Sequence, residues 1–377
     1  MRTLLYLSIP SFADTDITIL PGLTKNFRVS YAMIITNRES NFSMLEIEQF
    51  CNAHNILFIP LFVIRRQRDP RIVFEYAKMF KIANAFKTDL IYSFCFDHPL
   101  LSICSYRLDN RRTVIFIHDV KFHSSSRYLG ISRLGRKITI NRFQYFQVFS
   151  NSQATIFRQL YPKKIVYVIK QYLKNFERFT ANANINDVKG ENVRFLFFGR
   201  VLPYKGLKTL IHAINKLAMK YSNFELVIAG LCDDWEKSYE PLITNKDVIN
   251  KMIGKIANKD IPNLFRSCHY LILPYKDATQ SGPLLIAYNY YLPVIASNIE
   301  AFRENIRDSY NGFLFDYKDI SQLVKLLEDA VSRSMSDYIL LRQNVKEFVE
   351  NNISLEIILR DYDRMFEEIS DNLSKVL

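Results

Sequence analysis

The sequence predicts an α/β protein with two Rossmann-like domains, each built on a parallel sheet. Three observations predict this class. Short apolar runs alternate with stretches long enough for helices, which is typical of parallel sheets covered on both faces. The pattern occurs twice, on either side of a polar segment. Finally, 377 residues are many for one hydrophobic core, and a 49% hydrophobic content is enough to fill two.

The apolar runs give the expected strands in chain order. In the first half they cover residues 4–9, 29–35, 56–63, 90–94, 113–117 and 145–149. In the second half they cover residues 195–198, 224–229, 270–273, 294–296 and 312–315. Helical spacing of apolar residues predicts helices over 207–221 and 283–290, among others.

A polar, Asn-rich segment over residues 180–190 has no periodic apolar face and is the expected linker, with a hinge near 175–190. We therefore expect a first domain over 1–178 and a second over 190–354. Residues 355–377 form one amphipathic helical stripe. This last helix packs either on its own domain or back on the first one, and the sequence leaves both open.

The charge is divided unequally between the halves. Residues 1–180 hold 26 Lys and Arg against 12 Asp and Glu, a net charge of +14, whereas the remaining 24 and 26 give −2. Within 127–142, Tyr128, Ile131 and Leu134 recur at helical spacing among Arg133, Arg136 and Lys137. Such a segment suits an anionic membrane face, and an ordinary solvated helix is the alternative. Nucleic acid is a weaker candidate, since no RNA-binding motif is present.

The remaining composition points to a cytoplasmic protein that is soluble or peripheral to a membrane. Five scattered cysteines lack metal-ligand spacing and fit a reducing compartment. No window approaches the ~20 apolar residues of a membrane span, and the N-terminus does not match a signal peptide.

The most informative motif follows the expected strand 195–198. Gly199-Arg200 ends the strand, and Lys205-Gly206 precedes a helix. Arg200 can hold phosphate oxygens in a fork, Lys205 adds a point charge, and the helix directs its positive dipole end to the same place. The motif predicts a diphosphate site that needs no metal.

This region resembles family 4, or group 1, glycosyltransferases of the bacterial polysaccharide-biosynthesis type. The resemblance is carried by Phe198-Gly199-Arg200, Lys205-Gly206-Leu207, Thr279-Gln280-Ser281-Gly282 and Pro293-Val294-Ile295. It implies the GT-B architecture, in which two Rossmann-like domains face each other across a cleft. It also implies a nucleotide-sugar donor and retention of anomeric configuration.

The resemblance assigns donor-binding residues. It implies that Gly199, Arg200 and Lys205 hold the diphosphate, and that the N–H groups of Ser281 and Gly282, with Gln280, meet the donor sugar or phosphate. Lys255 and Ile256 are expected to accept the base through their backbone. Most members also carry two glutamates eight positions apart, but the matching positions here are Ala278 and Ile286. How the ribose is held is therefore not explained by the resemblance.

In the first domain, His118-Asp119 follows a strand directly, at the edge where α/β sheets bind ligands. His118 could donate to a sugar hydroxyl while Asp119 orients the ring, as a similar pair does in the family; a buried structural His is the alternative. His123, Ser150 and Ser152 are weaker candidates, and the two serines are more often helix caps.

Two Asp-x-Asp strings are not expected to bind metal. Asp14-Thr15-Asp16 follows the first strand, and we expect it on a loop that faces the acceptor. Asp361-Tyr362-Asp363 lies in the expected last helix, where its carboxylates point to different faces.

The sequence and the resemblance thus favour a metal-independent transfer of a sugar from a nucleotide donor to a saccharide acceptor, expected on a lipid carrier in bacterial surface polysaccharide synthesis. His118, Asp119, Arg200 and Lys205 are the expected catalytic residues. Because the two glutamates are absent, a catalytically silent subunit that supports a partner enzyme is the alternative. The base, the sugar, the linkage and the oligomeric state do not follow from the sequence.

Overall fold

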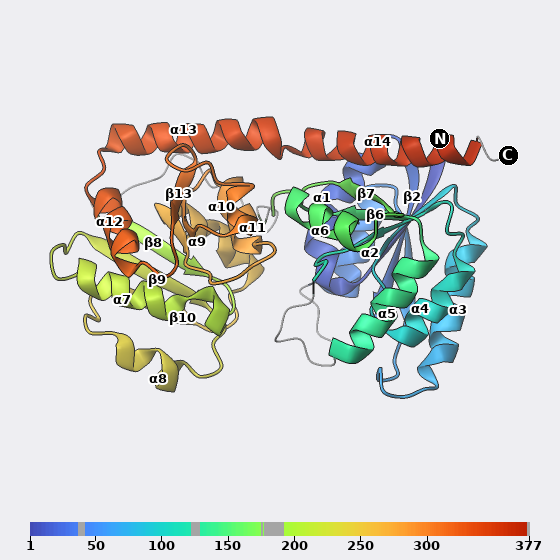
Figure 1. The fold of residues 1–377 in the computed structure, drawn as a ribbon, viewed down its shortest axis with the longest axis horizontal. Coiled ribbons are helices and arrows are strands. Elements are labelled where there is room, and N and C mark those ends of the chain that lie inside the picture. Colours follow the sequence, from blue (N-terminus) through green and yellow to red (C-terminus); the bar gives the residue numbers. More distant parts are fainter. Residues whose placement is uncertain (37–41, 122–128, 175, 177–191, 375–377) are drawn as a thin grey trace. The chain divides into compact units, whose positions relative to one another are not determined.

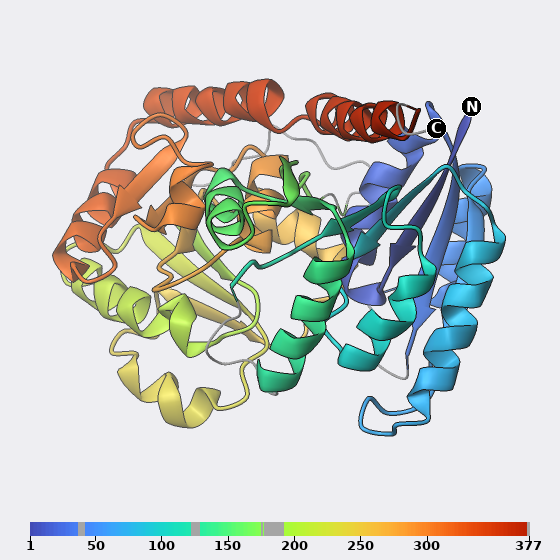
Figure 2. The same ribbon diagram turned by 45° about the vertical axis from the view of Figure 1, so that its right-hand side comes forward.

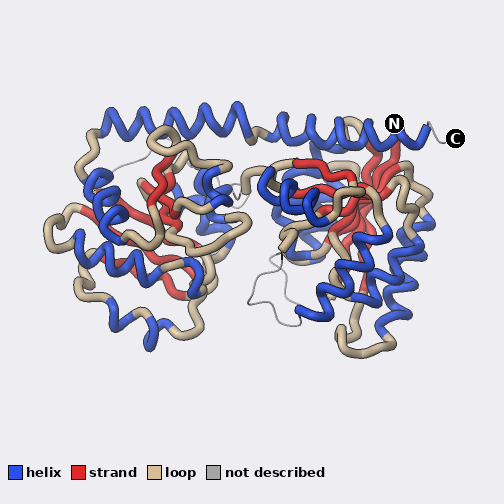
Figure 3. Tube along the Cα trace, in the orientation of Figure 1, coloured by secondary structure: helices blue, strands red, loops and turns tan. Residues whose placement is uncertain are grey.

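A computed structural model describes residues 1–36, 42–121, 129–174, 176 and 192–374. The chain divides into two compact units, Met1–Tyr172 together with Leu355–Leu377, and Leu173–Ser354. In each unit the strands form a central sheet between helices (Figure 3). The expected linker, residues 180–190, lies outside the described residues.

The first unit contains a seven-stranded sheet in the order β3-β2-β1-β4-β5-β6-β7, and every pairing is parallel (Figure 1). Its strands are β1 (Arg2–Ser8), β2 (Phe27–Ile35), β3 (Leu57–Phe62), β4 (Leu90–Phe94), β5 (Thr113–Phe116), β6 (Tyr145–Val148) and β7 (Ile165–Val168). Its helices are η1 (Pro10–Phe12), α1 (Ala13–Leu23), α2 (Met44–Ala53), α3 (Ile72–Ala85), α4 (Pro99–Cys104), η2 (Ser105–Arg107), α5 (Leu129–Arg142), α6 (Asn151–Leu160) and α14 (Leu355–Ser374).

The second unit contains a six-stranded parallel sheet in the order β10-β9-β8-β11-β12-β13. Its strands are β8 (Val193–Phe198), β9 (Phe224–Gly230), β10 (Ile249–Ile253), β11 (Tyr270–Leu273), β12 (Val294–Ser297) and β13 (Gly312–Phe315). Its helices are η4 (Pro203–Lys205), α7 (Leu207–Leu217), α8 (Trp235–Ser238), η5 (Glu240–Leu242), η6 (Asn258–Asp260), α9 (Ile261–Arg266), α10 (Gly282–Asn289), α11 (Glu300–Arg303), α12 (Ile320–Val331) and α13 (Met335–Asn352).

Two strands were not expected from the sequence, and both lie at sheet edges. β7 and β10 each have only one fully buried residue, because one side of an edge strand faces solvent. Their sequences therefore lack the continuous apolar run that identifies a buried parallel strand.

The last helix, α14, packs on the first unit. Phe366 meets Phe27 with ring centroids 5.3 Å apart, and the Tyr362 hydroxyl lies 3.1 Å from the Tyr92 hydroxyl. Asn26 Nδ2 donates to Asp363 Oδ2 over 2.7 Å. Asp361-Tyr362-Asp363 thus lies within a helix, as the sequence predicts, and its middle residue, Tyr362, is buried.

Both sheets reverse their strand order at one point. In the first sheet the reversal lies between β1 and β4, and in the second between β8 and β11. Beyond the carboxyl ends of such a strand pair, the loops diverge to opposite faces and leave room for a ligand. The two reversals therefore mark where binding residues are expected. Within the described part of the chain, no helix combines the length and apolar character that crossing a bilayer requires.

Candidate active site

The loop after β8 lies at the reversal point of the second sheet. Gly199 has φ +102°, and its N–H donates to the Ala229 carbonyl over 2.9 Å. Gly206 has φ +69°, and a methyl group there would lie 1.8 Å from the Pro274 carbonyl oxygen. Gly206 must be glycine for both reasons, since the backbone after β11 leaves no room for a side chain. The chain is thereby pinned on each side of Lys205.

Lys205 is a buried cation, with only 9% of the residue exposed. Its Nζ lies 5.4 Å from the centre of the Tyr275 ring. A methyl group on Gly199 would lie 3.2 Å from this Nζ and 3.7 Å from Cγ of Pro283, the second residue of α10. Neither a carboxylate nor a hydrogen-bond acceptor pairs with this ammonium among the described residues. Burial lowers the pKa of Lys205 to about 8. A bound anion would supply the missing counter-charge.

Arg200 is arranged differently from Lys205. Its Nη2 donates to Asp233 Oδ2 over 2.8 Å, and the two side chains are 56% and 70% exposed. An ion pair this exposed contributes little to stability, so a phosphate can replace the carboxylate at small cost.

The N-terminus of α10 lies beside Lys205. Ser281 is the N-cap, and its hydroxyl accepts from Leu284 N over 3.4 Å. Gln280, half-buried just before it, has an amide nitrogen with no partner in the part of the chain that the structure describes. This end of the helix offers the N–H groups and positive dipole end that the sequence predicts.

A third cation at this end was not anticipated. Lys174 Cε and Nζ lie 3.7 Å from the position that a methyl group on Gly282 would take. Lys174 belongs to an irregular segment without a motif or an apolar period, so no signal in the sequence identifies it. Its ammonium adds positive charge to the start of α10.

The predicted base-binding residues follow β10, two strands from β8 at the same edge of the sheet. Gly254 N donates to the Gly230 carbonyl over 3.1 Å, Lys255 is exposed, and Ile256 is half-buried. Ile286, which stands where a glutamate is usual, is 4% exposed within α10. It is one of five consecutive buried residues, 284–288, of that helix.

In the first unit, His118 follows β5, next to the reversal point. His118 Nδ1 lies 2.9 Å from Asp119 Oδ2, and 40% of its side chain is exposed. The rings of Phe12 and Phe149 each lie 5.9 Å away, centre to centre. The imidazole is thus oriented by a carboxylate and held by two aromatic rings while it stays open to solvent. It is not the buried structural His of the alternative interpretation.

The His118 loop is fixed by two buried side chains. Gln153 Nε2 donates to the His118 carbonyl over 3.2 Å, and Val120 N donates to Gln153 Oε1 over 2.7 Å. Arg136 Nη1 donates to the Asp119 carbonyl. Its Nε and Nη2 also donate to the two carboxylate oxygens of Asp97, over 2.9 and 2.7 Å.

The interpretation of Arg136 as part of a basic surface segment is wrong. The residue is only 8% exposed. Gly135 packs so closely on the Asp97 backbone that a methyl group there would lie 2.2 Å from the Asp97 carbonyl oxygen. This contact places the next residue on the inner side of α5. The glycine directly before Arg136 was the sequence signal for this burial, because a residue without a side chain permits close packing. Our interpretation used only the helical spacing of the apolar residues.

The expected loop position of Asp14-Thr15-Asp16 is also wrong, because both carboxylates lie in the first turn of α1. Asp16 is 1% exposed and accepts hydrogen bonds from three hydroxyls: Tyr6 at 2.9 Å, Tyr31 at 2.8 Å, and Ser8. Burial raises the pKa of Asp16 to about 7, although these hydrogen bonds lower it.

The weaker candidates have other places. Ser150 caps α6, its hydroxyl accepting from Gln153 N over 3.3 Å, and Ser152 lies 3.0 Å from it. His123 and Tyr128 lie outside the described residues. Where the structure describes the chain, it holds no group of three or more His, Cys, Asp or Glu placed to bind a metal.

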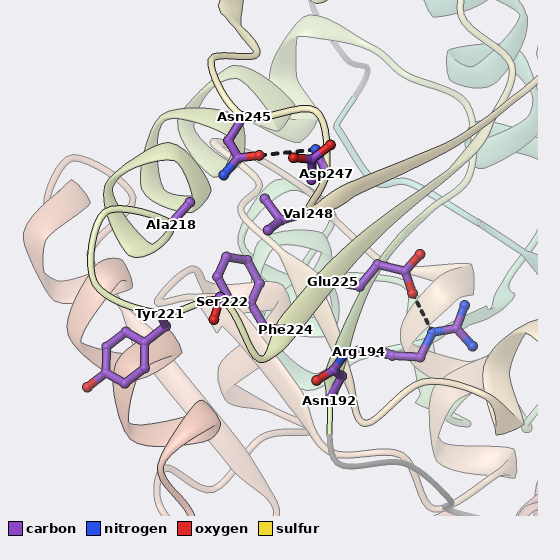
Figure 4. Close-up of a pocket in the computed structure, with 10 residues that line it drawn as sticks. All are labelled: Asn192, Arg194, Ala218, Tyr221, Ser222, Phe224, Glu225, Asn245, Asp247 and Val248. Atoms are coloured by element: carbon purple, nitrogen blue, oxygen red, sulfur yellow. Dashed lines mark hydrogen bonds and ion pairs between the residues drawn. The ribbon is translucent and has the colours of Figure 1, made fainter.

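A surface pocket in the second unit lies at the other end of the sheet. It is lined near the amino ends of β8, β9 and β10 by Arg194, Glu225 and Val248, among others (Figure 4). Arg194 Nε and Glu225 Oε2 pair there over 2.7 Å. Since all strands are parallel, this pocket is a sheet length from Gly199 and Gly254 and is not part of the predicted site.

Comparison with known proteins supports the predicted family. Residues 179–351 match the family model of glycosyl transferases group 1. The chain is 24% identical over 256 residues to an uncharacterized 41.2 kDa protein in the cps region of Klebsiella pneumoniae, covering 67% of this chain and 68% of that protein. It is 22% identical over 283 residues to the Escherichia coli UDP-Gal:alpha-D-GlcNAc-diphosphoundecaprenol alpha-1,3-galactosyltransferase, covering 68% and 71%.

Solved structures share the fold. A glycosyltransferase from Rickettsia africae matches with a TM-score of 0.74 at 17% identity, covering 98% of this chain and 99% of that one. Anabaena HepE in complex with UDP-glucose matches with a TM-score of 0.69 at 16% identity, covering all of both chains. The predicted GT-B class, with two parallel-sheet Rossmann-like domains, is confirmed.

Proposed function

Starting from a chain whose residues 179–351 are a group 1 glycosyltransferase domain, we propose that this protein moves a sugar from a nucleoside diphosphate donor to a saccharide acceptor. One observation carries the proposal. Lys205 is a buried ammonium without a counter-charge among the described residues, and it lies at the reversal point of the second sheet beside the start of α10. A diphosphate supplies the missing charge and suits both the cation and the helix end.

We assign a separate role to each part of the donor site. Lys205 and the N-terminus of α10 hold the diphosphate from the buried side, and Arg200 exchanges Asp233 for a phosphate oxygen. Lys174 adds charge at Gly282. Gly254-Lys255-Ile256 meets the base through its backbone. These cations do the work of a metal ion, so the transfer proceeds in EDTA.

The transfer retains anomeric configuration. The acceptor oxygen forms a bond to the anomeric carbon on the face from which the phosphate leaves, and the acceptor proton passes to the departing phosphate oxygen. Lys205, Arg200 and the α10 N-terminus stabilise the charge that develops on that oxygen, with about 2–4 kcal/mol from each cation. His118, oriented by Asp119, donates to a sugar hydroxyl.

The acceptor is a lipid-linked saccharide of bacterial surface polysaccharide synthesis. The Escherichia coli relative is named for a diphosphoundecaprenol acceptor, and the Klebsiella relative is named for a cps region. Such an acceptor requires the protein to work at the cytoplasmic face of a membrane.

The test incubates UDP-, GDP-, ADP- and CDP-sugars with diphosphoundecaprenyl saccharides in EDTA and follows the product by mass spectrometry. NMR of the product gives the anomeric configuration. We expect transfer from one nucleotide family with retention. Inversion would contradict the mechanism, and transfer only after a divalent metal is added would contradict metal independence.

A catalytically silent subunit is the second candidate, favoured by one observation. Ala278 and Ile286 replace the two glutamates usual in the family, so donor contacts are missing. Nucleotide binding at Lys205, without transfer to any acceptor unless a second protein is added, would support it.

A further inference from the structure

Three helices of the first unit lie side by side in one layer, with α4 packed between α3 and α5 (Figures 1 and 2). The layer is continuous, because Cys104 Sγ donates to the Val73 carbonyl and the Arg142 guanidinium lies 5.1 Å from the centre of the Tyr106 ring. Their outward surface carries large apolar side chains. These are Phe74 (73% exposed), Ile82 (37%), Ile103 (53%), Ile131 (52%) and Leu134 (53%), with Tyr106 (50%) on η2, which directly follows α4.

The same surface carries exposed cations. On α3, Phe74, Lys78, Lys81 and Ile82 recur at the spacing of one helix face, and all four are exposed. On α5, Arg133 and Lys137 are exposed beside Leu134. We call the six apolar residues and these four cations the α3–α5 surface.

Acidic side chains are scarce on the described residues of these three helices. The sequences of α4 and α5 contain no Asp or Glu. The one acid of α3, Glu75, is 17% exposed and accepts from Arg65 Nη1 and from the backbone N–H of Ile64, over 2.5 and 2.8 Å. Among the described residues of the three helices, the exposed charged side chains named above are therefore all cations.

We propose that the α3–α5 surface docks this protein on an anionic lipid bilayer. The cations would lie at the level of the lipid phosphates, while Phe74, Ile103 and Leu134 enter the boundary of the acyl chains. Peripheral attachment needs this combination, since charge attracts from a distance and apolar contact then adds short-range affinity. The inference concerns a surface separate from the donor site and does not depend on sugar transfer.

The apolar component favours a bilayer over nucleic acid. RNA would use the cations through its phosphates, but protruding isoleucine and leucine side chains gain little from a sugar-phosphate backbone. A bilayer uses both. The two partners therefore differ in what each type of substitution does.

The first experiment measures sedimentation of the full chain with vesicles of phosphatidylglycerol and phosphatidylethanolamine, and with phosphatidylcholine vesicles, without any sugar donor. We expect binding to the anionic vesicles only, weakened by salt. Replacing Lys78, Lys81 and Lys137 by Gln should weaken it about a hundredfold. Each such charge contributes about fivefold, the equivalent of about 1 kcal/mol.

The apolar component is tested by Phe74→Ser with Ile131→Ser and Leu134→Ser, which should weaken vesicle binding at least about tenfold. All these positions are exposed, so the thermal unfolding temperature should stay unchanged. The matched controls lie in the second unit: Lys216, Lys237 and Lys325 to Gln, and Met219, Met335 and Leu340 to Ser, all exposed in the wild type. Neither control should alter binding.

The insertion of the α3–α5 surface into the bilayer is measured by the quenching of tryptophan fluorescence in Ile131→Trp by brominated lipids. The wild type has a single Trp, Trp235, which is 6% exposed, so it serves as the blank and Met219→Trp as the second control. Quenching specific to Ile131→Trp is expected.

Equal vesicle binding by all variants would overturn the proposal. So would RNA binding that needs the three lysines while the apolar substitutions leave binding of RNA and vesicles unchanged.

Discussion

Two cations, one in each unit, are buried to nearly the same extent but serve different purposes. Lys205 is 9% exposed and Arg136 is 8% exposed. Arg136 is satisfied by both oxygens of Asp97 and by the Asp119 carbonyl. Lys205 faces the Tyr275 ring and has no hydrogen-bond acceptor or carboxylate partner among the described residues. Pairing distinguishes them, because a paired buried charge supports the fold and an unpaired one costs stability until a ligand arrives.

The same contrast applies to the loops at the carboxyl ends of the strands in the two sheets. In the second unit the backbone shapes the site, with Gly199 and Gly206 pinning the chain around one lysine. In the first unit, side chains from distant helices shape it, since Gln153 and Arg136 hold the His118 loop. The site in the second unit is suited to binding a charged group, whereas the site in the first unit keeps His118 in a fixed orientation.

The largest predicted effect comes from Lys205→Met. Loss of a cation that stabilises developing phosphate charge should lower kcat about 10²- to 10³-fold. Thermal stability should not fall, because the variant removes a charge that burial disfavours. Lys208→Met, an exposed lysine three residues later, is the control for both measurements. If Lys205→Met unfolds the second unit, Lys205 resembles Arg136 and the contrast fails.

Arg136→Met should do the opposite. It leaves Asp97 and the Asp119 carbonyl without their donor, and the free energy of unfolding should fall by about 2 kcal/mol, since Asp97 is partly exposed to water. Urea denaturation measures it, with Arg133→Met, exposed on the same helix, as control. An unchanged unfolding midpoint would show that the Arg136 contacts add nothing to stability.

Asp16 extends the comparison to a buried anion. Its folded-state pKa of about 7 lies above the ordinary value of 3.8, so the folded state binds more protons between these values, and stability falls as pH rises through this window. From pH 5 to pH 7 this group should account for a loss of about 2 kcal/mol. Asp16→Asn should remove that part of the pH dependence. Parallel pH profiles of wild type and variant would contradict the assignment.

The smallest effect is expected for Asp233→Ala. The exposed Arg200–Asp233 pair contributes less than about 1 kcal/mol to stability, so unfolding should barely change. Nucleoside diphosphate affinity should rise a few-fold, because Arg200 no longer has to leave a carboxylate. A weaker affinity would instead make Asp233 part of the binding site.

The fold, and the local shape of the loop around Gly199 and Lys205, could be predicted from the sequence. Buried parallel strands are continuous apolar runs, so all central strands were predicted, and only the half-exposed edges β7 and β10 were missed. The stretch around Gly199 and Lys205 is local as well, because a strand, a turn and a helix start are consecutive in the chain.

The residues that sequence missed depend on contacts between distant segments. Arg136 reaches Asp97, 39 residues away, and Lys174 reaches Gly282 from an irregular segment. Asp16 was expected on a loop because it follows the first strand closely. Its buried environment comes from Tyr6 on β1 and Tyr31 on β2, which the local sequence does not show. Helical periodicity predicts which face of a helix is buried, but it does not identify the residues from distant segments that contact that face.

The most direct test of the Lys205 assignment is calorimetric titration of UDP, GDP, ADP and CDP at pH 8 in EDTA, in two buffers of different ionisation enthalpy. With a pKa of about 8, Lys205 is half protonated there, and a bound diphosphate should draw about half a proton from the buffer. We predict one nucleoside diphosphate that binds with this uptake, and loss of the uptake in Lys205→Met. Binding without proton uptake, unchanged in that variant, would contradict the account.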